Sequence, residues 1–70
     1  MPLMIAEKNK ELTILRVSTD DKTKKHLESL GILQGSTIKI IAESAGNIIV
    51  KVKDGRLALN KELARTIMVA

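Results

Sequence analysis

The fold is decided by residues 48–59, which read Ile-Ile-Val-Lys-Val-Lys-Asp-Gly-Arg-Leu-Ala-Leu. Apolar residues alternate with other residues on both sides of an Asp-Gly pair, and Asp-Gly is a strong signal for a two-residue type I′ hairpin turn. Such a turn pairs Val52 with Leu57 and continues in register along both strands. The apolar side chains then share one face, so the segment predicts two antiparallel strands that bury one side.

Another strand is predicted before this hairpin, over residues 36–42, where apolar residues again alternate. A two-residue connection would set the outward-facing Ile41 opposite the inward-facing Val50. A three-residue loop, Ser44-Ala45-Gly46, instead pairs Ile40 with Val50 and places its glycine in the left-handed conformation that such loops require. The sequence therefore predicts a three-residue loop here.

A strand over residues 11–17 and a helix over residues 22–30 precede these hairpins. The Ser-Thr-Asp-Asp run before the helix supplies oxygens for an N-cap. Gly31 follows the helix, where a C-cap needs a positive φ, and Ile32 can fold back onto Leu27 as such caps require. This segment therefore predicts a helix that stops and redirects the chain.

The chain ends with Asn60 as a cap, a helical turn through Leu63 and Ala64, and a short strand over residues 66–69. With these, the sequence predicts five short strands, one helix after the first strand and a helical turn before the last. We expect a mainly β fold in which residues 1–70 form a single domain. A small, strongly bent barrel would remove the edges that a flat sheet of this size exposes.

The composition narrows the function classes. The 70 residues include no Cys, Phe, Trp or Tyr and one His, with a net charge of +4. Disulfides and thiolate metal sites are excluded, as is the usual base-stacking surface of single-strand nucleic-acid binders. No phosphate loop, dinucleotide motif or nucleophilic triad is present, which predicts a protein that is not an enzyme. The apolar N-terminal run ends at Glu7, too short for a signal sequence or membrane span, and predicts a cytoplasmic protein without membrane insertion.

Several segments resemble the FeoA family, the small ferrous iron transport protein A: Leu30-Gly31-Ile32 with Gly35, the run 47–50, the run 54–59 and the run 64–69. The resemblance implies an SH3-like barrel related to the C-terminal domain of iron-dependent repressors. It also implies a cytoplasmic, non-enzymatic protein without a cofactor, which acts on FeoB, the membrane ferrous iron transporter with a GTP-binding cytosolic domain. Family members commonly have Pro-Gly where this chain has Gln34-Gly35. The oligomeric state is left open.

Two surfaces are candidates for binding this partner. The first is the outward face of the two hairpins, where the predicted pairing sets Lys39 opposite Lys51, Lys53 opposite Arg56 and Ile41 opposite Ile49. Like charges directly opposite each other are unfavourable. Either the lysines protect exposed strands against association with other sheets, or the face binds an acidic partner.

The second candidate surface is the loop after the helix, formed by Leu27, Leu30, Gly31, Ile32, Leu33 and Gly35. One or two of its aliphatic side chains must complete the core. Leu33 cannot easily turn inward alongside Ile32, so it is the residue that we expect to anchor a partner, unless the whole segment is buried under the helix.

Two other functions remain open. A metal-binding or metal-sensing module would hold ferrous iron weakly through His26 and nearby carboxylates, although an exposed, uninvolved His26 is the simpler interpretation because three or four convergent ligands are needed. A basic nucleic-acid-binding barrel is supported only by the net charge of +4. The preferred prediction is an accessory protein of ferrous iron uptake with no nucleic-acid partner.

Overall fold

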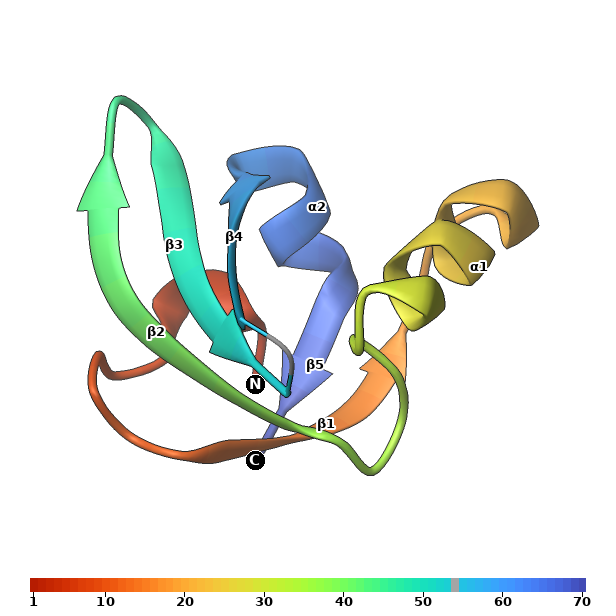
Figure 1. Cartoon of the computed structure of the whole chain (residues 1–70), viewed down its shortest axis with the longest axis horizontal. Coiled ribbons are helices and arrows are strands. Elements are labelled where there is room, and N and C mark those ends of the chain that lie inside the picture. The colour runs from red at the N-terminus through yellow and green to blue at the C-terminus, as the bar shows by residue number, and fades with distance from the viewer. Residues whose placement is uncertain (54) are drawn as a thin grey trace.

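The computed structural model describes residues 1–53 and 55–70 and contains five strands that form one sheet (Figure 1). Along the chain the elements are η1 (Leu3–Ile5), β1 (Leu12–Val17), α1 (Asp21–Ser29), β2 (Thr37–Ser44), β3 (Asn47–Val52), β4 (Gly55–Asn60), α2 (Lys61–Thr66) and β5 (Ile67–Val69). All pairings are antiparallel, and the strand order is β4-β3-β2-β1-β5. The predicted mainly β fold, with one helix after the first strand and a short one before the last, is confirmed.

The sheet is strongly bent but not closed. β2 curves through the length of the sheet (Figure 1), and β4 and β5 stand at opposite ends of the strand order. Within residues 1–53 and 55–70 the two end strands do not pair with each other; α2 connects them and packs against both. The SH3-like barrel is therefore looser than expected, because a helix of six residues takes up the space where the last strands would meet.

The β3–β4 pairing is two residues out of register with the prediction. Val52 lies opposite Gly55, and Leu57 lies opposite Val50 instead of Val52. The turn type predicted for Asp54-Gly55 involves Asp54, which lies outside the described residues. A slip of two residues leaves every side chain on its own face of the sheet, so the hydrophobic pattern could not distinguish the two registers.

The β2–β3 loop also differs from the prediction. Ser44 pairs with Asn47, which leaves a two-residue loop of Ala45 and Gly46, both with positive φ (51° and 81°) as in a type I′ turn. The register shifts between Ile40 and Ala42, where one extra residue forms a β-bulge. The bulge restores the expected pairing of Ile40 with Val50. An extra residue within β2, and not a longer loop, therefore keeps the outward-facing Ile41 from lying opposite the inward-facing Val50.

Ala45 is a strained position in this turn. An L-residue with a side chain is disfavoured at a φ of 51°, whereas Asn adopts this conformation more readily. We expect Ala45→Asn to raise the free energy of unfolding by about 0.5–1 kcal/mol, measured by urea denaturation. Asn at the exposed Ala42, which lies within β2, is the control and should not stabilise the protein. Equal effects at both positions would contradict the assignment of strain to the turn.

Helix α1 covers Asp21–Ser29, one residue earlier at each end than the predicted 22–30, and has the caps that the sequence predicts. Asp20 is its N-cap and accepts a hydrogen bond from the backbone N–H of Thr23 at 3.1 Å. At the other end Gly31 has a φ of +96°, and the backbone N–H of Ile32 donates to the carbonyl of Leu27 at 2.9 Å. The Gly31 N–H donates to the carbonyl of Glu28 at 3.0 Å, which completes a Schellman motif.

The N-cap of α1 is sensitive to acid. The side chain of Thr23, its backbone N–H and the hydroxyl of Thr19 hold the pKa of Asp20 below its ordinary value of 3.8. A lowered pKa means that the stabilisation is complete above about pH 4 and is lost as the pH falls through the folded-state pKa. We expect the Thr23 amide resonance to titrate with a midpoint below 3.8 in NMR spectra. In Asp20→Asn, which keeps the accepting oxygen, this titration should disappear while the helix remains.

The core includes a segment that the sequence did not single out. Leu3 in η1 has no exposed surface, and η1 packs against α2 and β5. Met1 and Val69 exchange two backbone hydrogen bonds of 2.7 Å, and Pro2 bridges Met68, so the N-terminal segment covers the edge of β5. The remaining core residues are Leu12, Ile14, Val17, Leu27, Ile32, Ile38, Ile40, Ile48, Val50, Val52, Leu59, Ala64, Ile67 and Val69.

Candidate functional site

The outer face of the sheet carries a row of three cations. Lys51 on β3 lies directly opposite Lys39 on β2 and directly opposite Arg56 on β4. The predicted Lys39–Lys51 pair is confirmed, whereas the expected pairing of Lys53 with Arg56 is wrong because of the shifted register. The flanking Ile40 and Val50 are buried, so the three cations project away from the core.

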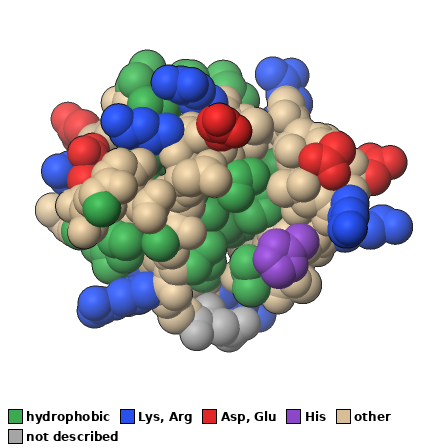
Figure 2. Space-filling view, turned by 90° about the horizontal axis from the view of Figure 1, so that it is seen from above, with side chains coloured by type: hydrophobic (Ala, Val, Ile, Leu, Met, Phe, Trp, Pro, Cys, Tyr) green, Lys and Arg blue, Asp and Glu red, His purple; other side chains and the backbone are tan. Residues whose placement is uncertain are grey.

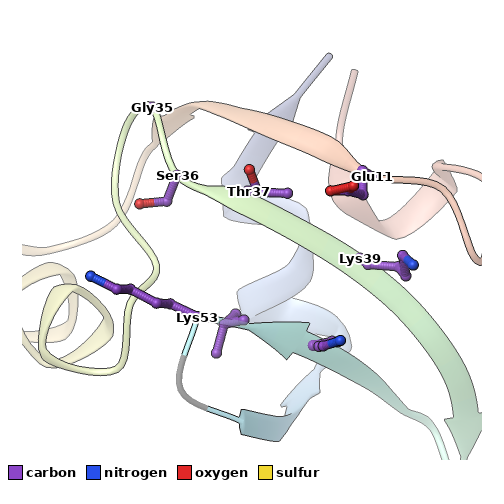
Figure 3. A pocket seen from close by; sticks show the side chains of 8 residues that line it. Glu11, Gly35, Ser36, Thr37, Lys39 and Lys53 are labelled. Carbon is purple, nitrogen blue, oxygen red and sulfur yellow. The ribbon is translucent and has the colours of Figure 1, made fainter.

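A groove of about 500 Å³ lies beside Lys39 and Lys51 of this row (Figure 3). Lys39 and Lys53 lie at its two ends in the view, with Ser36 and Thr37 on the β2 side and Glu11 on the segment that leads into β1. The lining residues are Glu11, Gly35, Ser36, Thr37, Lys39, Lys51, Val52 and Lys53. Three lysines against one carboxylate make this groove attractive to anions.

An apolar row lies beside the cation row, one pleat further along the strands. Ile49 on β3 is opposite Ala42 on β2 and Ala58 on β4. The expected pairing of Ile41 with Ile49 is wrong, because Ile41 occupies the β-bulge; both isoleucines are half-buried. Small side chains therefore flank Ile49 on both sides, which keeps this part of the outer face shallow and apolar.

The loop between α1 and β2 exposes two leucines. Leu30 and Leu33 are 38% and 40% exposed, on either side of the fully buried Ile32. Leu27 is also buried, so of the residues predicted to bind a partner, Leu27 and Ile32 are core residues whose side chains fix the loop and cannot contact a partner. We call the rest of this segment the leucine loop: the exposed Leu30, Leu33 and Gly35 and the half-buried Gly31.

Part of the leucine loop adjoins the β3–β4 hairpin that carries two of the cations. Leu30 and Arg56 line the same cleft of about 180 Å³, between the end of α1 and the β3–β4 hairpin. A Cβ placed on Gly31 would lie 3.9 Å from the Cβ of Lys53, and Gly35 lines the groove that Lys53 also lines. Figure 2 shows hydrophobic side chains across the middle of one face, with Lys and Arg side chains at its margin. The two candidate surfaces therefore adjoin at Leu30, Gly31 and Gly35, whereas Leu33 lines a separate cleft with Arg16, Val17, Lys24 and Glu28.

His26 is not part of a metal site in the described part of the chain. No group of three or more His, Cys, Asp and Glu side chains comes together among residues 1–53 and 55–70. His26 itself is exposed in the last turn of α1, and Asp20 is committed to the helix cap.

Four groove residues, Glu11, Ser36, Thr37 and Val52, were not identified from the sequence as site residues, and three of them are polar: Glu11, Ser36 and Thr37. These three reach the groove because β1 pairs with β2 through Leu12–Ile38 and Thr13–Thr37. These two strands are separated by α1, so no turn residue specifies their register. The alternation of Leu12 and Ile14 against Ile38 and Ile40 indicates which faces are buried, but not which residues are opposed.

Comparison with known proteins identifies the family. The FeoA domain model matches residues 1–70. The chain belongs to the FeoA family. A FeoA relative from Methanocaldococcus jannaschii, named "Putative Fe(2+) transport protein A", is 31% identical over 68 residues, which cover 97% of this chain and 83% of the relative. The FeoA family takes part in ferrous iron transport, and the resemblance inferred from the sequence is confirmed.

Solved structures agree with this assignment. The crystal structure of an iron uptake regulatory protein (FeoA) superposes with a TM-score of 0.85 and 30% identity over 99% of this chain and 92% of that one. A manganese-dependent transcriptional repressor in complex with manganese superposes with a TM-score of 0.86 and 26% identity, over 100% of this chain but 35% of the repressor. The FeoA fold thus recurs as the SH3-like domain of a longer, metal-dependent repressor. No helix in residues 1–53 and 55–70 combines the length and apolar character needed to span a membrane.

Proposed function

We propose that this chain is a non-catalytic, cytoplasmic accessory protein of ferrous iron uptake that binds the GTP-binding cytosolic domain of the FeoB membrane transporter. Residues 1–70 act as one domain in this role, and the chemistry of transport belongs to the transporter. Membership of the FeoA family and the role of that family in ferrous iron transport support the proposal.

The observation that carries the proposal is the exposed pair of leucines next to cations. Leu30 and Leu33 are held in fixed positions because Ile32, which lies between them, is buried. The backbone N–H of Ile32 also donates a hydrogen bond to the carbonyl of Leu27 in the Schellman motif. Aliphatic anchors on a fixed loop with a charged rim are typical of protein interfaces. In the proposed complex Leu30 and Leu33 fill apolar pockets of the transporter domain, and Lys39, Ile41, Ile49, Lys51, Lys53 and Arg56 form the adjoining contact.

The test is an NMR titration of the labelled protein with the GTP-binding domain at near-physiological salt, with ferrous iron added last under anaerobic conditions. We expect shifts confined to the leucine loop and the outer face of β2–β4. Leu33→Asp should weaken binding by about tenfold or more, since a buried charge replaces an apolar anchor. Ile5→Asp is the matched control, because Ile5 is 71% exposed on η1, and it should bind as the unmodified protein does.

Two outcomes would contradict the proposal. If the domain causes no shifts but ferrous iron shifts His26 and its neighbours, the chain is a metal-binding module related to the repressor domain. If Leu33→Asp and Ile5→Asp weaken binding equally, the leucine loop is not the contact surface.

A further inference from the structure

The outer face of β2, β3 and β4 presents two parallel rows with different chemistry. The cation row is Lys39, Lys51 and Arg56, and the apolar row is Ala42, Ile49 and Ala58. Each row runs across the strands, because its members are directly opposed residues on neighbouring strands. The two rows are two residues apart along β3, or about 7 Å.

We propose that this face docks an acidic amphipathic helix of the partner protein, lying across the strands with its carboxylates on the cation row. The inference rests on the proposed function, since it specifies which element of the partner the sheet face recognises. Its argument comes from spacing, from charge and from the adjoining apolar row.

Spacing favours a helix over an extended segment. Three neighbouring strands span about 10 Å, because strands lie about 4.8 Å apart. Carboxylates at helix positions i, i+4 and i+7 cover about 10.5 Å along one face. An extended segment presents same-side residues every 6.6–6.8 Å, so three of them cover about 13 Å and fall out of step with the row.

The apolar row explains why the helix should be amphipathic. A helix about 10 Å wide that seats its carboxylates on the cations also covers the neighbouring pleat. Ala42 and Ala58 leave room on both sides of Ile49, which is half-buried and offers its remaining surface to the ligand. Aliphatic side chains on the helix face next to the carboxylates would pack there.

Charge gives the docked helix its position along the row. Lys39 and Lys51 are like charges directly opposite each other, as are Lys51 and Arg56, an arrangement that is unfavourable in the free protein and that ligand carboxylates relieve. Glu11 lines the groove at the Lys39 end and opposes a carboxylate there. The strongest contacts should therefore be with Lys51, Arg56 and the nearby Lys53.

The experiment measures binding of a synthetic helical peptide by fluorescence anisotropy at low and near-physiological salt. The peptide carries Glu at i, i+4 and i+7 beside an apolar stripe; a second peptide has the same composition with its Glu residues distributed around the helix. We expect the first peptide to bind more tightly. Lys51→Glu should weaken its binding by about tenfold, whereas Lys22→Glu, the same charge change on exposed α1, should alter it by about twofold or less.

Two further results separate docking from misfolding. Lys51→Glu places an acid between two cations, so its denaturation midpoint should not fall. Glu11→Gln should tighten binding by about twofold at low salt, a gain that an unfolded variant cannot give.

The inference is overturned if both peptides bind equally, if Lys51→Glu and Lys22→Glu have equal effects, or if duplex DNA or anionic vesicles bind in preference to the peptide. If the transporter domain binds but Lys51→Glu leaves that binding unchanged, the inference is wrong and the proposed function stands. If the peptide binds as expected and the domain does not, the proposed function is wrong and the sheet face still docks an acidic helix.

Discussion

Leu3→Ala is expected to lower the free energy of unfolding by about 2–5 kcal/mol. The side chain has no exposed surface and lies where η1 packs against α2 and β5, so its removal leaves a cavity at the open side of the sheet. A chain of this length has a total stability of about 4–10 kcal/mol, so the loss is a large fraction of it. Urea denaturation followed by circular dichroism measures the effect.

The matched control is Ile5→Ala in the same short helix. Ile5 is 71% exposed, so this variant should change the free energy of unfolding by about 0.5 kcal/mol or less. A similar small effect for Leu3→Ala would show that the N-terminal segment leaves the sheet in solution and that the core closes without it.

The role of Leu3 could not be derived from the sequence, for a physical reason. The first six residues are apolar without a helix or strand period, and Glu7 ends the run. The burial of Leu3 depends on the packing of η1 against α2 and β5, and on backbone hydrogen bonds between Met1 and Val69 at the far end of the chain. Local pattern carries no information about such a long-range contact.

Features set by local chemistry were predicted correctly. The Schellman motif at Gly31, an N-cap within residues 18–21 and the N-cap at Asn60 each depend on a few adjacent residues. The structure shows all three, with Asp20 as the first cap. The buried face of each hairpin was also predicted, because alternation determines which side chains point inward. The exception is Ala42, which the alternation placed with Ile38 and Ile40 but which lies on the outer face beyond the bulge.

Features that alternation leaves undetermined were not predicted. The β3–β4 register differs from the prediction by two residues, a shift that leaves every side chain on its own face. The bulge at Ile41 adds one residue to β2, and the hydrophobic pattern does not indicate its position. The slip in the β3–β4 register turns the predicted cation pairs into a single row centred on Lys51. The composition of the site was therefore visible in the sequence, whereas its geometry depended on registers that only the folded sheet specifies.

A second large effect is expected in the leucine loop. Ile32→Ala should lower the free energy of unfolding by about 2–5 kcal/mol, because Ile32 is fully buried and forms the hydrophobic contact of the Schellman motif with Leu27. Leu33→Ala, the adjacent position, should lower it by about 0.5 kcal/mol or less, since Leu33 is 40% exposed. Thermal and urea denaturation of both variants give the comparison.

The contrast between these neighbours separates stability from binding. The sequence left open whether Leu33 completes the core or projects from it, and a loss of about 2 kcal/mol or more in Leu33→Ala would place it in the core. With the expected small loss, any weakening of partner binding in Leu33→Ala reflects a lost contact and not a loosened loop. Ile32→Ala should weaken binding indirectly, because without the buried anchor Leu30 and Leu33 no longer keep fixed positions, and a partner must then order them at an entropic cost.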